Sequence, residues 1–351
     1  MRSTLLIRLS ILVVLLVVIV AGGNVALRRY LASPLALPAA GYHLDIPAGT
    51  TWAAVTRQLA GDGIVKAAPV LRLYGRWSGD AGRIQAGEYL LQPGLTPRTL
   101  LRELVEGRVL LHRWTLVEGW TVREILRTLA ADAAVAHTLG SIDTITATLE
   151  QARALSSALG LPWPSAEGAF LPETYRFPRG TTDRALLLRA HAALMVELDK
   201  AWAGRAPDLP LADPYQLLIL ASIIERETGL ASERAQIAGV FIRRLKLGMR
   251  LQTDPTVIYG LGDRFDGNLT RRHLETDAAW NTYTRAGLPP TPIAAPGAES
   301  IAAAAHPADG KALFFVATGN GDGSHHFSDT LGEHEAAVRA YLANLRNHRD
   351  R

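Results

Sequence analysis

One acidic residue inside an apolar stretch is the first candidate for chemistry. Residues 217–229 are apolar enough for a buried helix, yet the stretch contains Glu225 and Glu227. At 3.6 residues per turn, Glu227 falls on the side that carries Ile223 and Ile224, whereas Glu225 falls on nearly the opposite side, in a more polar setting. Because burial disfavours the charged form of a carboxyl, we expect the pKa of Glu227 to be raised, so that it can act as a general acid.

A structural role competes with this interpretation. A glutamate near the end of a helix commonly reaches solvent or forms an ion pair, here with Arg226 or Arg234. Structural acids outnumber catalytic ones, so the helix by itself favours the structural role. The residues that follow in the chain favour the catalytic role of Glu227.

Two polar loops after this helix suit a carbohydrate ligand. In the first, Asp254 precedes Pro255, which is the pattern of a helix N-cap with proline at the first helical position, while Gln252 has no such structural explanation. The second contains Asn281 and Tyr283 and runs into the proline-rich residues 287–293. Planar amides pair with sugar hydroxyl and acetamido groups, and aromatic rings stack on pyranose rings, so these loops predict a glycan site.

Other motifs are weaker or are excluded. Glu167 is the one upstream carboxylate considered near the site, although such a residue more commonly caps a helix or forms an ion pair. His325 and His326 lie on alternate faces of a predicted strand, so we expect solvated or substrate-facing histidines and no metal site. The glycines of residues 319–323 lack the strand-to-helix context of a phosphate loop, which argues against nucleotide binding.

The elements that position these residues are mostly helices. Ser232 is the expected N-cap of a helix over residues 233–247, with Gly248 as its C-terminal stop. Further helices are expected over residues 183–202, 298–305 and 333–345, and residues 311–317 and 325–327 are expected to form a β-hairpin. Helices and short strands together predict an α+β fold.

A strand-turn-helix motif occurs three times before residue 130. In each copy a glycine turn is followed two residues later by a threonine placed as a helix N-cap, and the pairs are Gly49 and Thr51, Gly94 and Thr96, and Gly119 and Thr121. The spacing between copies is unequal, so the motif does not predict a solenoid. Residues 42–110 resemble the LysM-like modules of peptidoglycan enzymes, and a plain packing domain is the alternative.

Composition limits the class of protein. A chain of 351 residues with 48% hydrophobic residues can form two or three folded domains. The net charge of +4 is small and dispersed, with no basic cluster interleaved with aromatic residues, so nucleic-acid binding is not expected. The absence of cysteine excludes disulfides, Cys-ligated zinc and thiol catalysis.

The N-terminus predicts a single membrane-spanning helix. Residues 9–27 are uncharged and just long enough to cross a bilayer core of about 30 Å. A cleaved signal peptide is the alternative, but the apolar run is long for one and no small-residue cleavage site precedes Arg28. Arg2 and Arg8 favour a cytoplasmic N-terminus, residues 1–8, while Arg28 and Arg29 oppose it. Residues 28–41 are expected to form an extended linker.

With its motifs in this order, the chain resembles the endolytic murein transglycosylases, the YceG-like family of bacterial inner-membrane proteins. The resemblance extends over nearly the whole chain and is carried by residues 221–228, 231–234, 250–260, 281–283, 287–290, 295–297 and 326–327. It implies a catalytic domain over residues 111–351. In that family the catalytic acid is the glutamate that precedes threonine, which corresponds to Glu227 here.

The resemblance implies a lyase that needs no cofactor. Such an enzyme cleaves the MurNAc-GlcNAc β-1,4 bond of nascent peptidoglycan strands beside the membrane, leaves a 1,6-anhydroMurNAc end, and so terminates strand elongation. Peptidoglycan glycan strands and the inner membrane are the implied partners, with peptidoglycan synthases as further candidates, and the catalytic domain is expected in the periplasm. The residues expected to hold the glycan are Gln252, Tyr259, Asn281 and Tyr283, with Glu167, Asp254 and His326 behind them.

Two other functions remain open at this stage. A muramidase would use water and a second carboxylate, either Asp254 or Glu167. A membrane-tethered scaffold would bind glycan without cleaving it, and Glu227 would then be structural.

Overall fold

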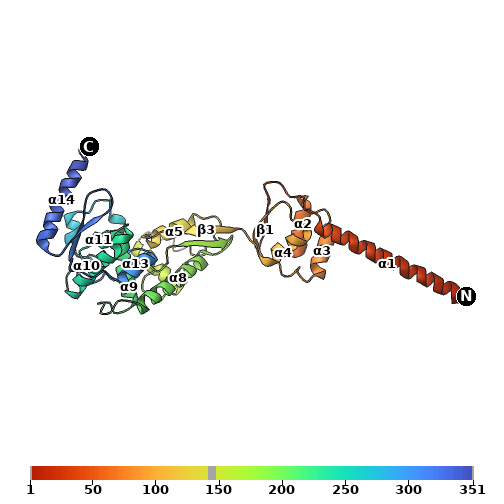
Figure 1. Ribbon diagram of the computed structural model, residues 1–351, viewed down its shortest axis with the longest axis horizontal. Coiled ribbons are helices and arrows are strands. Elements are labelled where there is room, and N and C mark those ends of the chain that lie inside the picture. Colours follow the sequence, from red (N-terminus) through yellow and green to blue (C-terminus); the bar gives the residue numbers. More distant parts are fainter. Residues whose placement is uncertain (1, 141–147, 350–351) are drawn as a thin grey trace. The chain divides into compact units, whose positions relative to one another are not determined.

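The fold is seen in a computed structural model that describes residues 2–140 and 148–349. The chain divides into two compact units, Met1–His112 with Phe177–Gly180 and Arg113–Arg176 with Thr181–Arg351 (Figure 1). Helices combine with small antiparallel sheets, which confirms the expected mixture of helix and sheet. Residues 141–147 and 350–351 of the expected catalytic domain lie outside the described part.

The N-terminal helix α1 (Arg2–Ala32) is longer than the apolar run that predicted it. It continues through Arg28 and Arg29, and its stretch Ser10–Ala32 is apolar and long enough to span a membrane. Side chains from Ile11 to Val20 are more than half exposed, so this part of α1 is not a helix of a soluble core. Length and composition fit either a membrane anchor or a signal sequence.

Residues 33–41 lack regular secondary structure, as expected of a linker, but they are attached to the first folded unit. The backbone N–H of Leu35 donates to Leu95 O at 2.8 Å, and that of Ala36 donates to Ile64 O at 3.3 Å. Leu35 and Leu37 pack against the core of this unit, and Leu31 at the end of α1 is 2% exposed. These leucines cover an apolar surface, so residues 33–41 are held against the first unit by backbone hydrogen bonds and apolar contacts.

The first unit is a β-α-α-β arrangement followed by a further helix. Its elements are β1 (Tyr42–Ile46), α2 (Trp52–Gly61), α3 (Ala68–Trp77), β2 (Gly87–Leu91) and α4 (Pro97–Glu106). The strands β1 and β2 pair antiparallel, with Tyr42 opposite Leu91. Alternate strand residues such as Leu44 and Tyr89 meet the apolar faces of the helices in one core.

All three expected threonine N-caps are confirmed. The hydroxyls of Thr51, Thr96 and Thr121 accept hydrogen bonds from the N–H groups three residues later, at the starts of α2, α4 and α5 (Val122–Ala130). The glycines two residues before them have φ values between 76° and 95°, a backbone conformation that glycine adopts without strain.

The second unit consists mainly of helices packed around α9. In chain order its helices are α5 (Val122–Ala130), α7 (Thr148–Leu159), α8 (Asp183–Ala203), α9 (Pro214–Glu227), η1 (Ala231–Glu233), α10 (Arg234–Lys246), α11 (Asp254–Leu261), η2 (Gly262–Arg264), α12 (Arg271–Glu275), α13 (Ala298–Ala305) and α14 (Leu331–Arg349). Its strands β5 (Phe314–Ala317) and β6 (His325–Ser328) form the expected antiparallel hairpin. A third two-stranded sheet joins β3 (Leu111–Thr115) to β4 (Thr174–Pro178), where the chain passes between the two units.

Helix α9 is the central element of this unit. Asp213 caps its N-terminus by accepting from Gln216 N, and Pro214 occupies the first turn, where its missing N–H costs nothing. Every residue from Leu217 to Ile224 is buried. The helix contacts α8, α10, α11 and α13, which lie around it in Figure 1. The helix ends at Glu227, where the chain leaves the core.

Helix α10 begins differently from the prediction. Ser232 lies inside the short helix η1 and is not an N-cap, because α10 starts only at Arg234 and has no side-chain cap. The expected C-terminal stop is confirmed, since Gly248 follows the helix with φ of 69°.

Candidate active site

Glu227 occupies the last position of helix α9, at the edge of the core. Thr228 follows with extended dihedral angles and ends the helix. Glu227 is only half-buried, although Leu217 to Ile224 of the same helix are all buried. A carboxyl in this place is removed from bulk water but remains open to a ligand.

The pKa of Glu227 is raised to about 7, chiefly because burial disfavours the carboxylate. The hydrogen bond from Thr253 opposes this shift, the charge of Asp254 adds to it, and the positive charges of His325 and Arg244 oppose it. A carboxyl with this pKa is protonated in a large fraction of molecules near neutral pH. It therefore meets the requirement of a general acid that works at physiological pH.

The loop before helix α11 holds the Glu227 carboxyl in place. The hydroxyl of Thr253 donates to Glu227 Oε1. Thr253 is fixed in turn, because its N–H donates to the hydroxyl of Thr282 at 3.1 Å and its carbonyl accepts from the hydroxyl of Thr256 at 2.8 Å. The orientation of Glu227 thus depends on two loops that are distant in sequence.

Glu227 lines a cavity of about 510 Å³ in the second unit. This volume is in the range of cavities that bind small ligands. The wall combines acidic, basic, amide and aromatic side chains from α9, α10, the loop before α11, the start of α11, the loop of Tyr283, the hairpin β5–β6 and α14. The lining residues are Glu227, Arg244, Leu251, Gln252, Asp254, Tyr283, Phe314, Phe315, Val316, Ala317, His325, Leu331, His334 and Val338.

Three of the expected glycan-binding residues lie in this cavity with Glu227. They are Gln252, Asp254 and Tyr283. The Tyr283 hydroxyl donates to Asp254 Oδ1 at 2.6 Å. Gln252 has a φ of 51°, which a non-glycine residue rarely adopts, and strained backbone of this kind often occurs at binding sites.

Asp254 is not the N-cap that its sequence context suggested. The N-cap of α11 is Thr253, and Asp254 is already helical, with Pro255 one position further on. This shift by one residue releases the Asp254 side chain from a capping role. The carboxylate is therefore available at the cavity wall.

Tyr259 and Glu167 lie apart from this cavity, in the protein interior. Glu167 is fully buried and accepts hydrogen bonds from Val122 N and from the Tyr259 hydroxyl, both at 3.0 Å. Burial raises the pKa of Glu167 to about 8. Both residues thus support the start of α5 from within, and neither lines the Glu227 cavity.

Asn281 and His326 are also placed elsewhere. Asn281 is 1% exposed, and its Nδ2 donates to the carbonyls of His273, Leu274 and Thr276, which fixes the loop that carries Tyr283. His326 is exposed on strand β6 and lines a different depression, beside α14. Asn281 therefore acts on the cavity only through the loop it orders.

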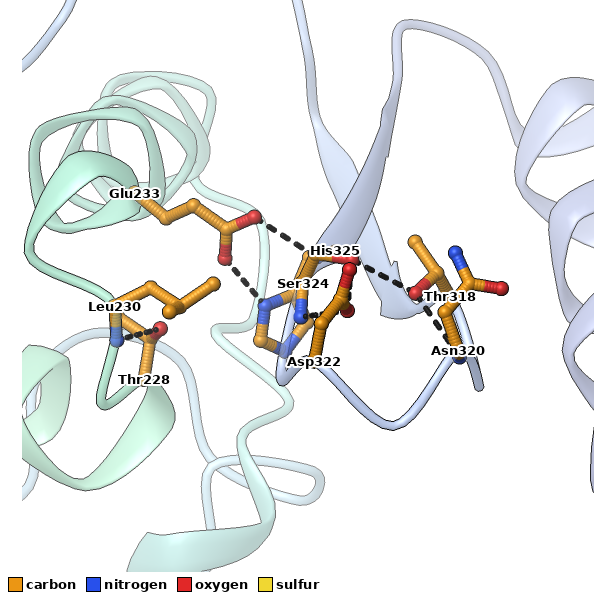
Figure 2. A network of polar contacts seen from close by, with 8 residues as sticks. All are labelled: Thr228, Leu230, Glu233, Thr318, Asn320, Asp322, Ser324 and His325. Carbon is orange, nitrogen blue, oxygen red and sulfur yellow. Dashed lines mark hydrogen bonds and ion pairs between the residues drawn. The ribbon is translucent and has the colours of Figure 1, made fainter.

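One histidine that lines the cavity is His325, which the sequence did not single out from its neighbour. Figure 2 shows its imidazole directed toward Glu233, with Nδ1 at 2.7 Å from Oε2, while the His325 backbone N–H donates to Oε1 at 2.9 Å. This pair fixes the hairpin to the segment that directly follows Glu227. The same close-up shows Leu230 N donating to the Thr228 hydroxyl, which orders that segment.

Arg244 and His334 are two further lining residues that the sequence analysis missed. Arg244 extends from α10 and is 7% exposed. A signal for it was present, since Ile237, Val240 and Phe241 precede it at helical spacing and form the apolar face of α10. His334 comes from α14 and stacks on Phe314 with ring centroids 5.2 Å apart.

The structural interpretation expected an ion pair between Glu227 and Arg226 or Arg234. The glutamate of helix α9 that lies near Arg234 is Glu225. Arg234 Nη2 lies 3.7 Å from Glu225 Oε1, and Glu225 Oε2 accepts from Gly297 N at 3.0 Å. Arg226 donates to the carbonyl of Gly119 at 3.2 Å. The two glutamates have therefore separate environments, as their positions on the helix predicted.

The cavity is equipped for proton transfer to a neutral polar ligand. Glu227 can supply a proton near neutral pH, Asp254 adds a second carboxylate, and Gln252 and Tyr283 add hydrogen-bonding groups. Within residues 2–140 and 148–349, no three His, Asp or Glu side chains are grouped as metal ligands.

Comparisons with known proteins point to one family. The sequence profile of the YceG-like family matches residues 44–340. A Bacillus subtilis protein named endolytic murein transglycosylase is 29% identical over 311 residues, 86% of this chain and 85% of that protein. A Streptococcus pneumoniae protein of the same name is 25% identical, over 85% of this chain and 58% of the longer relative. The crystal structure of a YceG-like protein from Listeria monocytogenes is 28% identical, with a TM-score of 0.53, over 84% of this chain and 98% of that one.

Proposed function

The chain belongs to the YceG-like family, and on this basis we propose that it is a lytic transglycosylase, a lyase that cleaves peptidoglycan glycan strands. Relatives from two bacteria carry the name endolytic murein transglycosylase. The structural observation that carries the proposal is Glu227, a carboxyl with a pKa of about 7 on the wall of a cavity of about 510 Å³.

Glu227 performs both proton transfers of the reaction. As an acid it protonates the oxygen of the MurNAc-GlcNAc β-1,4 bond, and the bond from C1 to that oxygen breaks. As a carboxylate it then takes the proton of the C6 hydroxyl of MurNAc, whose oxygen bonds to C1. The products are a 1,6-anhydroMurNAc end and a GlcNAc end, and no water is consumed.

One strong carboxyl is sufficient for this reaction because the nucleophile belongs to the substrate. Hydrolysis of a glycoside ordinarily requires two carboxyl groups, one of which activates water or attacks C1. Here the remaining rate enhancement comes from holding the C6 hydroxyl close to C1. Gln252, Tyr283 and Asp254 contact the glycan in this proposal, and Asn281 orders the loop of Tyr283.

The first unit supplies a second glycan contact and the tether. The β-α-α-β order of β1, α2, α3 and β2 supports the assignment of residues 42–110 as a LysM-like module. Helix α1 acts as an inner-membrane anchor with a cytoplasmic N-terminus, which its exposed apolar side chains support. The catalytic unit is then periplasmic and acts on nascent strands near the membrane, where peptidoglycan synthases are candidate partners and strand elongation is terminated.

A muramidase is the alternative that one observation favours. Asp254 lies in the same cavity as Glu227, so a second carboxylate is available to activate water. Glu167, the other carboxylate considered, does not line this cavity.

The product of the reaction distinguishes these functions. The full-length protein in detergent is incubated with uncrosslinked peptidoglycan, with the Glu227→Gln variant in parallel, and the products are weighed by mass spectrometry. We expect anhydro ends, lighter than reducing ends by one water, from the wild type and none from the variant. Reducing ends identify a muramidase, and intact strands from both proteins contradict an enzymatic function.

A further inference from the structure

Arg244 is a buried cation held by backbone carbonyl groups. Its Nε donates to Leu313 O at 2.6 Å, and its Nη1 donates to Leu251 O at 2.7 Å and Arg250 O at 3.3 Å. The guanidinium carbon also lies 5.1 Å from the centre of the Phe314 ring. These contacts fix the plane of the guanidinium group at the wall of the Glu227 cavity.

No carboxylate forms a close ion pair with this cation within the part of the chain that is described, although the charge of Glu227 acts on it from further away. Arg244 forms no ion pair there, whereas Arg234 on the same helix faces three glutamates. Its Nη2 makes no hydrogen bond with the described residues and is not among their buried unpaired atoms, so this nitrogen is open to the cavity. Removing a charge from water without a counter-ion is costly, and an anionic ligand would offset that cost.

A second polar group on the same wall has no partner among residues 2–140 and 148–349. His334 packs on the Phe314 ring, as Arg244 does, and its Nδ1 is buried without a hydrogen bond to these residues. Burial and the nearby Arg244 charge lower the pKa of His334, so the imidazole is neutral near pH 7 and has one N–H to donate. Arg244 and His334 therefore both offer hydrogen-bond donors to a ligand, and neither side chain carries a negative charge.

We propose that Arg244, with His334 beside it, is an anion subsite that binds a carboxylate on the C3 side chain of the muramyl residue. The proposal rests on the proposed function and deepens it. A guanidinium group with its plane fixed and a free nitrogen is well suited to a carboxylate. The carboxylate has two sources in peptidoglycan: the stem peptide, or the lactyl group where the peptide has been removed.

This subsite would determine which saccharide lies next to Glu227. MurNAc and GlcNAc differ only by the lactyl group at C3 and what is attached to it. Recognition of that side chain places MurNAc, and not GlcNAc, on the side of the bond where the anhydro ring forms. Arg244 would therefore set the register of cleavage along an alternating strand.

The acids of the cavity are compatible with an anionic ligand. Glu227 is uncharged when it acts as the acid, so it does not repel the substrate at that stage. Asp254 accepts a hydrogen bond from Tyr283, and the described residues include no ion pair between Asp254 and Arg244. His325, the remaining titratable group on the wall, is paired with Glu233.

The test compares two pairs of substrates with the full-length enzyme. Uncrosslinked strands carrying stem peptides are compared with the same strands after their carboxylates are converted to primary amides. Strands freed of peptide by an amidase, which leaves the lactyl carboxylate, are compared with the same strands after amide conversion. We expect kcat/KM to fall about tenfold or more in the pair that contains the recognised carboxylate, which identifies its source. Equal rates within both pairs would overturn the subsite.

Arg243 provides a matched control. It lies on the same helix and also donates to backbone carbonyls, of Ala308 and Ala312, but it does not line the cavity. We expect Arg244→Gln and His334→Ala to reduce the discrimination between charged and amidated strands, and Arg243→Gln to retain it. If Arg244→Gln retained the discrimination, the assignment would be wrong.

The discrimination is the ratio of kcat/KM for charged strands to kcat/KM for amidated strands, both measured with the same protein. A smaller amount of folded enzyme lowers both values equally, so the ratio does not change. If Arg244→Gln is too unstable to assay, the wild-type ratios and His334→Ala still decide. Failure of this subsite is also separable from failure of the proposed function. In the first case the substrates are cleaved, with equal rates within each pair, and in the second none is cleaved.

Discussion

The hydroxyl of Thr253 donates a hydrogen bond to the carboxyl of Glu227 and lowers its pKa, against the larger effect of burial. In Thr253→Val this donor is lost at nearly constant shape, so the pKa of Glu227 should rise above about 7. Because the acid works in its protonated form, the alkaline limb of kcat/KM against pH should move up by about one unit. The control is Thr128→Val, which removes a hydroxyl that contacts Trp114 and the carbonyl of Ile125 and does not contact Glu227 or Thr253. An unchanged limb in Thr253→Val would exclude Glu227 as the group that titrates.

The glutamine variants of the two glutamates of helix α9 should behave differently. Glu227→Gln removes the proton donor, and we expect strand cleavage to fall by roughly 10²–10⁴-fold with little change in thermal stability. Glu225→Gln weakens the contact with Arg234, so we expect a lower melting temperature with cleavage retained. Cleavage rates and thermal unfolding of both variants test this pairing, and equal loss of activity in both would contradict it.

Asp254→Asn tests whether the second carboxylate takes part in the reaction. If the nucleophile is the C6 hydroxyl of the substrate, cleavage should persist and the products should still carry anhydro ends. The Asp254 charge raises the pKa of Glu227, so its removal should also shift the alkaline limb of kcat/KM to lower pH. Complete loss of cleavage would instead support the muramidase.

Glu167 should make the stability of the catalytic unit depend on pH. The pKa of Glu167 is about 8 in the folded protein and 4.5 in the unfolded chain. Its contribution to the free energy of unfolding is therefore fully present below pH 4.5 and is lost as pH rises to about 8. Relative to Glu167→Gln, the wild type should lose about 1.4 kcal/mol of unfolding free energy per pH unit in this window. Urea unfolding at several pH values measures the difference.

The exposed Glu173 provides the comparison for this experiment. Glu173→Gln removes an exposed carboxyl and controls for the loss of one negative charge. A difference between Glu167→Gln and the wild type that stays constant with pH would show that Glu167 does not carry the pH dependence. Retained cleavage in Glu167→Gln would further exclude it as a second catalytic carboxylate.

The sequence predicted the structure best where a residue type has a single local structural role. The threonine caps, the glycine stop after α10 and the boundaries of α13 depend on interactions within a few residues, and the pattern contains all of them. The contrast between Glu225 and Glu227 was also available, because helical geometry fixes which side chains share a face.

The composition of the cavity wall was harder to predict because it depends on contacts distant in sequence. Tyr259 and Asn281 lie in the same loops and helix as true lining residues, but their side chains are directed to Glu167 and to backbone carbonyls. His325 and His326 differ only in the face of β6 that they occupy, and that face is determined by how the hairpin packs on α10 and α14.

The last helix imposes an order on assembly. Leu331, His334 and Val338 of α14 line the cavity, although more than a hundred residues separate Val338 from Glu227. At typical elongation rates the ribosome needs roughly 5–20 s to make that intervening length of chain. A chain that already contains its acid therefore remains an incomplete enzyme until its final helix has emerged and docked, so a truncated product would carry the acid but lack part of the cavity wall.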